Sequence, residues 1–329
     1  MRAVVVREAG GVEVMHLDEV AAPVPVPGEV RVRVHAFGVN RGDILQRRGQ
    51  YPAPPGAPAD ILGLEYAGEV ELVGPGVSGF SAKDRVMGIA GGGTYAELVV
   101  VPAEHLLPIP AQLSMEQAAA IPEVFVTAFD ALERAALTRD EWCLVHAVGS
   151  GVGTAVLQLA KARGARVIGT SRSAAKLERA RALGLDAAID TSVEPDFVAA
   201  VRRVCGDGVQ VAIDLIGGPR FPSTLAALAL RGRAVLLGLT AGARAEVDLT
   251  VVLRRRLKVE GTVLRSRTRS EKADVTRAFG ASVLPLFEQG MVHPVIDRVY
   301  SLEEVREAHR RVEADENFGK VVVRVGSSG

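Results

Sequence analysis

"HAVGSGVGTAVLQLAKARGARVIGTSRS", residues 146 to 173, decides the fold of this chain. It reads as an apolar strand, a glycine-rich turn, a helix and a second apolar strand. Gly149, Gly151 and Gly153 lie in the turn, where the pyrophosphate of a dinucleotide needs backbone amides at a helix N-terminus with no Cβ atoms in the way. Thr154 stands where a literal G-x-G-x-x-G would have its third glycine, so a tight structural turn is the alternative.

Alternating strands and helices surround this stretch, which makes the dinucleotide interpretation much stronger. The strands are uniformly apolar, as is typical of a parallel sheet covered by helices on both faces. The sequence predicts strands at 142–149, 165–171, 187–192, 209–218, 232–240 and 257–264, with helical segments that include 153–164, 174–184 and 221–232. We therefore expect a doubly wound parallel sheet.

The two ends of the chain have a different texture. The first hundred residues contain short strands punctuated by Gly and Pro, and in residues 29–40 three valines alternate with Arg31, Arg33 and His35, which predicts a barrel-like all-β region. Residues 114–136 have helical periodicity, and a new domain begins at about residue 114. The last part predicts helices at 271–290 and 301–315 and a final strand at 319–325, which can return to the first barrel.

Length and composition limit the function classes. A chain of 329 residues favours two domains, and its 39 basic and 39 acidic residues give no global sign of a nucleic-acid or membrane partner. Cys143 and Cys205, the only cysteines, lie far apart in apolar segments, so neither a disulfide framework nor a thiolate metal cluster is expected. The N-terminus has no signal-peptide pattern, and the uncharged run 142–160 is broken by its glycine turn, so we expect a cytoplasmic protein.

The end of the second strand is where NAD and NADP are distinguished. An Asp or Glu there would bind the ribose 2′-hydroxyl and repel a 2′-phosphate. This strand ends in Ser171 and Arg172 instead, and Lys176 follows on the next helix. A hydroxyl and two cations suit a phosphate, so the sequence favours NADPH. The alternative is that Arg172 and Lys176 are ordinary exposed residues near a helix start.

Seven segments of the chain together carry a resemblance to a known family: "GVNRGDILQRRGQYPAPPGA", "ILGLEYAGEVELVGPGV", "AAAIPEVFVTAF", "HAVGSGVGTAVLQLAK", "AIDLIGG", "VLRSRTRS" and "AHRRVEADENFGKVVV". They resemble the medium-chain dehydrogenase/reductase superfamily, and within it the zinc-independent quinone oxidoreductases, in the branch of the mammalian tumour-suppressor-inducible quinone oxidoreductase. The resemblance implies a GroES-like β-barrel catalytic domain in residues 1–121 and 265–329, a Rossmann domain in 122–264, a cleft site, and a homodimer or homotetramer.

Zinc can be tested at the positions where zinc-dependent relatives carry their ligands. Those relatives have a Cys in the turn after the strand that here ends "GVN", and a His in a G-H-E motif. This chain has Asn40 and Leu64 there, and neither is a plausible zinc ligand. Two distant cysteines also cannot build the four-cysteine structural site. We therefore expect no metal, and a reaction that needs no Lewis acid.

The resemblance also implies site residues. Asn40, Asp43 and Tyr51 match the segment that lines the substrate cleft, where Tyr51 would stack on a flat ring or donate a proton; Asp43 could instead be a helix cap. Thr127 and four loop residues match contacts around the nicotinamide, and Asn317 and Lys320 match a C-terminal element near the cofactor. The full cofactor set is Thr127, Val148, Gly149, Ser150, Gly151, Val152, Gly153, Ser171, Arg172, Lys176, Leu239, Thr240, Leu264, Ser266, Asn317 and Lys320.

The chain departs from the branch it resembles at the cofactor's 2′-phosphate side. That branch has a Tyr near the position of Thr191 and no arginine at the position of Arg172. Arg172 either replaces the contact of that Tyr or makes no contact with the cofactor.

Three functions remain open at this stage. The first is hydride transfer from NADPH to a quinone, because a quinone needs little activation and the cofactor supplies the reactivity. The second is NADPH-dependent reduction of the C=C bond of an α,β-unsaturated carbonyl compound, which uses the same hydride geometry. The third, of another class, is a non-catalytic RNA-binding or structural role, although the balanced charge argues against nucleic acid.

Overall fold

The computed structural model describes residues 1–326 and divides them into two compact units. The first unit comprises residues 1–126 and 264–326, and the second comprises residues 127–263. The expected domain boundaries after residues 121 and 264 differ from these by five residues and one residue. Whether each unit folds as an independent domain stays a prediction.

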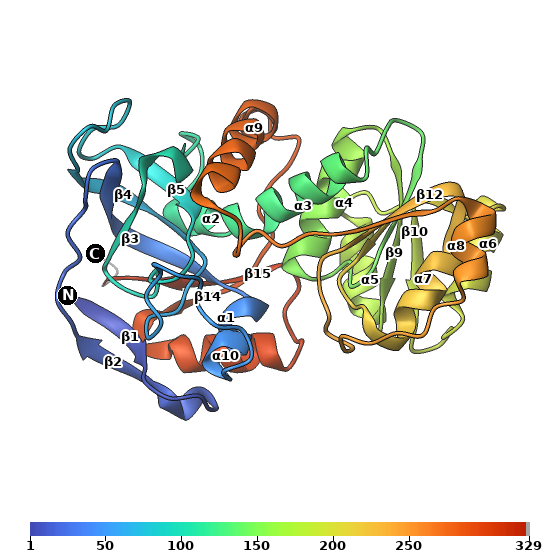
Figure 1. The fold of residues 1–329 in the computed structure, drawn as a ribbon, viewed down its shortest axis with the longest axis horizontal. Helices are drawn as coiled ribbons and strands as arrows, with labels where there is room; N and C mark the ends of the chain where they lie inside the picture. The colour runs from blue at the N-terminus through green and yellow to red at the C-terminus, as the bar shows by residue number, and fades with distance from the viewer. Residues whose placement is uncertain (327–329) are drawn as a thin grey trace. The chain divides into compact units, whose positions relative to one another are not determined.

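The first unit is built on a seven-stranded sheet with the order β14-β15-β3-β4-β5-β7, and β6 pairs with β3 off this path (Figure 1). The last strand, β15, pairs antiparallel with β3, so the two ends of the chain share one sheet. A separate two-stranded sheet joins β1 and β2. The strands are β1 (Arg2–Val6), β2 (Met15–Glu19), β3 (Glu29–Val39), β4 (Glu65–Val73), β5 (Arg85–Ile89), β6 (Leu98–Pro102), β7 (Leu106–Pro108), β14 (Ile296–Ser301) and β15 (Lys320–Arg324).

The helices of the first unit begin with capping residues that the sequence supplies. Asn40 and Asp43 form a capping box at the start of α1 (Arg41–Arg47), and Thr268 and Glu271 form one at the start of α9 (Arg269–Glu288). The other helices are α2 (Met115–Ala119), α10 (Val305–Glu313) and the first turn of α3 (Pro122–Arg134). The helical segment expected over 114–136 contains two helices, because Pro122 has no amide hydrogen and begins a new one.

The second unit contains six parallel strands in the order β10-β9-β8-β11-β12-β13. Counted along the chain this is the order 3-2-1-4-5-6 of a doubly wound dinucleotide-binding sheet, whose strand order reverses between β8 and β11. The strands are β8 (Trp142–Val145), β9 (Arg166–Ser171), β10 (Ala187–Asp190), β11 (Val209–Asp214), β12 (Leu228–Leu236) and β13 (Lys258–Gly261); the helices are the rest of α3, α4 (Gly151–Ala162), α5 (Ala174–Arg181), α6 (Phe197–Cys205), α7 (Phe221–Ala227) and α8 (Leu249–Arg255).

One helix predicted in the second unit ends earlier than expected. The segment 221–232 is helical only to Ala227, and β12 already begins at Leu228. Leu228 and Ala229 are buried, whereas Leu230 and Arg231 are exposed. The alternation of Leu and Ala there fits either period, and pairing with β11 decides for the strand. None of the helices within residues 1–326 is both long and apolar enough to cross a membrane.

Candidate active site

The glycine turn joins β8 to α4 in the second unit. Ser150 is the N-cap of α4, and its Oγ accepts a hydrogen bond from the amide of Gly153 at 3.0 Å. A Cβ atom at Gly153 would lie 2.4 Å from the carbonyl oxygen of Ala147, so no other residue fits this close approach. The amides of Gly151 and Val152, in the first turn of the helix, have no intrahelical acceptor and are suited to bind an anion.

The side chains expected at the 2′-phosphate lie together at the end of β9. Ser171 is the last residue of this strand, and its Oγ accepts a hydrogen bond from the amide of Ser173 at 3.1 Å. Arg172 is exposed, and Lys176, in the first turn of α5, is half-buried. This end of β9 therefore presents a hydroxyl and two cationic side chains, and Asp190 lies in register with Ser171 on the neighbouring strand β10.

The remaining expected residues of the second unit differ in accessibility. Val148 is buried, and its amide donates to the carbonyl of Thr170 at 3.1 Å, so it shapes the turn. Leu239 and Thr240 follow β12 and are exposed, while Thr127 is half-buried on α3. Leu239 and Thr240 are thus open to a ligand at the carboxyl edge of the sheet, where ligands of such folds bind.

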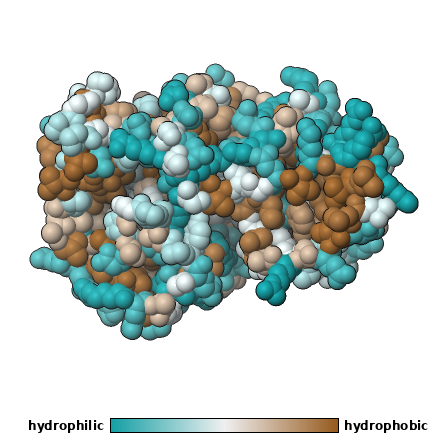
Figure 2. Space-filling model, viewed as in Figure 1, coloured by the Kyte–Doolittle hydropathy of each residue, from teal (hydrophilic) through white to brown (hydrophobic). Residues whose placement is uncertain are grey.

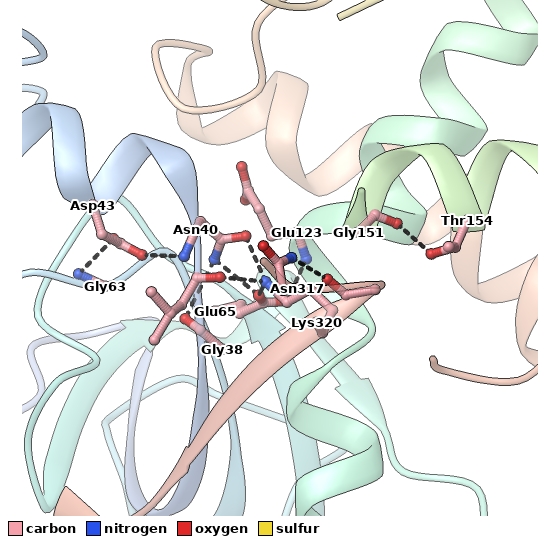
Figure 3. A network of polar contacts seen from close by, with 12 residues as sticks. Gly38, Asn40, Asp43, Gly63, Glu65, Glu123, Gly151, Thr154, Asn317 and Lys320 are labelled. Atoms are coloured by element: carbon pink, nitrogen blue, oxygen red, sulfur yellow. Dashed lines mark hydrogen bonds and ion pairs between the residues drawn. The ribbon is translucent and has the colours of Figure 1, made fainter. Parts of the chain in front are cut away.

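In the first unit, Lys320 is the centre of a buried ion-pair network (Figure 3). Its Nζ lies 2.5 Å from Glu65 Oε1, 2.6 Å from Asn40 Oδ1 and 3.0 Å from the carbonyl oxygen of Val39, so each ammonium hydrogen has an acceptor. A Cβ atom at Gly38 would lie 2.2 Å from Glu65 Oε1, which explains the glycine there. Lys320 therefore joins β15 to β3 and β4 in the core of the first unit.

Asn40 has little hydrogen-bonding capacity left for a substrate. Its Nδ2 donates to Glu65 Oε1 at 2.9 Å and to the carbonyl of Gly38 at 3.3 Å, and its Oδ1 accepts from Lys320. These contacts fix which side of the amide carries oxygen. Asn40 thus orients the end of β3 and the start of α1.

Asp43 is fully buried and holds three groups. Its carboxylate accepts hydrogen bonds from the amides of Asn40 at 2.8 Å and Gly63 at 3.1 Å and from the hydroxyl of Tyr95 at 3.2 Å. Burial raises the pKa of Asp43 to about 6, and the hydrogen bond from the Asn40 amide opposes that rise. The expectation that Asp43 could be a cap is what its geometry fits best.

Tyr51 lies over Arg265, whose guanidinium carbon is 4.7 Å from the centroid of the tyrosine ring. Arg265 is buried and donates to the carbonyl oxygens of Tyr51 at 3.1 Å and of Gly91 at 3.0 and 3.1 Å. Tyr51 itself is half-buried, and loss of surrounding water raises the pKa of its hydroxyl. The phenol therefore keeps its proton at neutral pH and can donate it.

Glu123 is a site residue that the sequence interpretation missed. It follows Pro122 at the start of α3, and its amide donates to Glu65 Oε2 at 2.9 Å. Loss of water and the nearby Glu65 carboxylate raise the pKa of Glu123 to about 8, so its carboxyl group is protonated at pH 7. The signal in the sequence was the acid in "AAAIPEV", directly after the proline that begins the helix.

Three further expected cofactor residues belong to the first unit. Leu264 is buried, Ser266 is exposed, and Asn317 is half-buried with its Nδ2 donating to the carbonyl of Gly319 at 2.7 Å. Only Ser266 presents a fully accessible side chain. Leu264 and Asn317 fit a role in shaping the segments that carry them.

Two family models match the chain. The alcohol dehydrogenase GroES-like domain matches residues 26–111, and the zinc-binding dehydrogenase model matches residues 151–280. Together with the sheet order they cover both units. The chain is a medium-chain dehydrogenase/reductase. This confirms the resemblance to that superfamily and the fold class expected from the sequence, and it makes the protein an oxidoreductase of the Rossmann-type dinucleotide-binding kind.

Relatives of this dehydrogenase/reductase span its whole length. Quinone oxidoreductase from Rattus norvegicus is 32% identical, with 98% of this chain and 97% of the relative covered. The crystal structure of an NAD-dependent alcohol dehydrogenase is 36% identical with a TM-score of 0.87, covering 99% of this chain and 100% of that one. The structure of mycobacterial Rv1454c complexed with NADPH is 30% identical with a TM-score of 0.89, covering 98% and 99%.

The name of one family model implies zinc, and the residues of this chain do not fit that metal. Asn40 and Leu64 stand at the expected ligand positions, and Leu64 is a buried hydrocarbon. The ammonium group of Lys320 contacts both Asn40 and Glu65, where it would repel a second cation. No group of three or more His, Cys, Asp or Glu residues suited to a metal occurs within residues 1–326.

Proposed function

We propose that this dehydrogenase/reductase is a zinc-independent, NADPH-dependent quinone oxidoreductase. The observation that carries the proposal is the sequence at the end of β9 and the start of α5, which holds Ser171, Arg172 and Lys176 and has no Asp or Glu within residues 171–177. A carboxylate at that position would repel a 2′-phosphate, whereas a hydroxyl and two cations attract it. The similarity to quinone oxidoreductases supports the choice of acceptor.

When bound, the reduced nicotinamide supplies the hydride. The chain's own part is to bind, orient and deliver a proton. The amides at the start of α4 would hold the pyrophosphate, and Leu239, Thr240 and Thr127 are the residues we assign to the nicotinamide end. Tyr51 and Glu123 both hold a proton at neutral pH, so either can protonate the reduced acceptor.

Reduction of an activated C=C bond is the second candidate, and Glu123 favours it. A quinone reduced by hydride leaves an oxygen anion that water can protonate, whereas a reduced enone needs a proton placed on carbon. A neutral carboxylic acid is suited to that task. The two candidates are separated by kcat/KM for a panel of ortho- and para-quinones and for enones of matched size.

The cofactor proposal is tested by binding. We expect NADPH to bind at least about tenfold more tightly than NADH, because a charge-assisted contact to phosphate is worth about 1.5 to 3 kcal/mol. Arg172→Ala should remove most of this preference, and Lys176→Ala part of it. Arg181→Ala, at the far end of α5, is the matched control and should change neither affinity. Equal binding of NADH and NADPH by the wild type would overturn the proposal.

We also propose that the protein is a homo-oligomer. The edge strand β13 is exposed along all four of its residues, and nearby helix α8 exposes Leu249 and Leu253. Figure 2 shows an apolar patch over α8. An exposed edge strand beside apolar side chains is suited to pair with a second copy. Light scattering should give a dimer or tetramer, and Leu253→Glu should shift it toward the monomer.

A further inference from the structure

A buried hydrogen-bond chain crosses the carboxyl ends of three strands in the second unit. His146, directly after β8, has its Nδ1 2.9 Å from Thr170 Oγ1 on β9 and its Nε2 3.0 Å from Thr224 Oγ1 on α7. Thr224 Oγ1 donates to Asp214 Oδ2, at the end of β11, at 2.8 Å. All four residues are at most 2% exposed, so these hydrogen bonds are closed to water.

The hydrogen bonds of this chain run in one direction. Thr224 gives its only hydroxyl hydrogen to Asp214, so it must accept from His146, which places the imidazole hydrogen on Nε2. His146 Nδ1 is then an acceptor, and Thr170 donates to it. Burial lowers the pKa of His146, which keeps the ring neutral as this pattern requires. Every polar group in the chain is satisfied.

Each end of the chain holds a segment at the ligand-binding edge of the sheet. Asp214 Oδ1 accepts hydrogen bonds from the amides of Ile216 at 2.7 Å and Gly217 at 2.9 Å, and Gly217 has a φ of 61°. At the other end, Thr170 directly precedes Ser171, and its carbonyl oxygen accepts from the amide of Val148 in the glycine turn. The chain thus ties the end of β9 to the loop 215–218.

The hydrogen-bond network lies at the point where the strand order of the sheet reverses, between β8 and β11. Ligands of doubly wound sheets bind at such a point. A core of apolar residues would be a simpler way to fill the same space, because a buried polar network adds stability only when all its members are satisfied. What the polar chain adds is a fixed relation between two loops.

We propose that His146, with Thr170, Thr224 and Asp214, is a positioning network that couples the 2′-phosphate end of the cofactor site to the loop 215–218. The inference rests on the proposed use of NADPH for its ligand, but the coupling itself is a property of the second unit. None of the four side chains need touch the cofactor. Breaking the chain at β9 should therefore be felt at the loop after β11.

The experiment interrupts the hydrogen-bond network at two places with the substitutions Thr170→Val and Thr224→Val, made alone and together. Amide hydrogen exchange of Ile216 and Gly217 is measured without ligand, and the dissociation constants of NADPH and NADH by fluorescence. We expect Thr170→Val to speed exchange at both amides about fivefold or more and to weaken NADPH about fivefold. The double variant should be no worse than either single one, since one break already disconnects the chain.

Two controls separate positioning from general destabilisation. Thr170→Ser restores the hydroxyl and should restore both readouts. Thr276→Val removes a buried hydroxyl that has no hydrogen-bond partner within the described residues and should alter neither. Additive effects of the two substitutions, or unchanged exchange at Ile216 and Gly217 in Thr170→Val, would overturn the coupling. A wild type that prefers NADH would overturn the proposed cofactor, while the exchange readout still decides the coupling.

Discussion

Each unit of the molecule contains a buried polar network, and the two are built from different groups. The network of the first unit is ionic: Lys320 pairs with Glu65, and the fully buried Arg47 pairs with Glu313. The network of the second unit uses an imidazole, two hydroxyls and the single carboxylate of Asp214. The first network contains buried ion pairs, whereas the second consists mainly of neutral groups whose hydrogen bonds all run in one direction.

The difference predicts how each network responds to damage. Removing one member of a buried ion pair leaves a charge that water cannot reach, which costs several kcal/mol. Removing a hydroxyl from a neutral chain leaves an unsatisfied donor or acceptor, which costs about 1 to 3 kcal/mol. Stability should therefore depend most on the first unit, whereas loop order should depend on the second.

The largest effect is expected for Lys320→Met. Glu65 is completely buried and would lose its counter-ion, so the first unit should be destabilised by about 3 to 5 kcal/mol. The four tyrosines, Tyr51, Tyr66, Tyr95 and Tyr300, all belong to the first unit, and the only tryptophan, Trp142, belongs to the second. Urea unfolding followed by tyrosine absorbance and tryptophan fluorescence thus reports each unit separately.

The control for this prediction removes the charge of the partner as well. Lys320→Met combined with Glu65→Gln leaves no buried charge in the pair and should recover part of the lost stability. A double variant that unfolds at the same urea concentration as the single one would show that the ion pair is not the source of the effect.

The next largest effect is on the catalytic rate, and it tests whether the protonated carboxyl group of Glu123, in the first unit, supplies a proton. Because the pKa of Glu123 is raised to about 8, activity that depends on its proton should fall as the pH rises through 8. Glu123→Gln should lower kcat for an enone about 100-fold at pH 7 and remove this alkaline limb. Tyr51→Phe is the companion variant; if it alone removes the limb, Tyr51 and not Glu123 supplies the proton.

Much of the second unit could be predicted from the sequence because its signals are local. The glycine turn and the cations after Ser171 lie within 28 consecutive residues, and apolar strands alternate regularly around them. The helix boundary at Ala227 was missed because the alternating Leu and Ala after it fit either period, and pairing with β11 decides.

The centre of the first unit could not be predicted in the same way. Glu65 lies 255 positions before its partner Lys320, and the residues next to either of them in the sequence do not indicate the pair. His309 and Tyr95 are separated by 214 positions and meet only because α10 packs within the first unit. Lys320 was expected at the cofactor, but its three buried contacts assign its hydrogens to the first unit itself.

A smaller effect is a pH dependence of stability that comes from the fully buried His309. Arg47 donates to His309 Nδ1 at 3.0 Å, so His309 Nε2 donates to Tyr95, and burial lowers the pKa of His309 to about 3. The unfolded chain binds this proton near pH 6.5, so the stability that His309 contributes is present above 6.5 and is lost as the pH falls toward 3. Between pH 6.5 and 5 the loss is about 1 to 2 kcal/mol.

The measurement compares wild type with His309→Gln by tyrosine absorbance at both pH values. Asp43, whose pKa is raised to about 6, acts with the opposite sign and is present in both proteins, so the difference isolates His309. We expect the variant to lose less stability on acidification. An equal loss in both would show that His309 is not the group that binds the proton on unfolding.

The smallest effect is on the stability of the second unit and comes from the N-cap of α4. Ser150→Ala removes the acceptor for the Gly153 amide and should destabilise the second unit by about 1 kcal/mol, seen by Trp142 fluorescence. Ser150→Gly, which leaves the amide open to water, should cost only a few tenths. Because Ser150 lies in the second unit and all four tyrosines lie in the first, neither variant should move the tyrosine transition. A shift of that transition as large as for Lys320→Met would mean that the two units do not unfold separately.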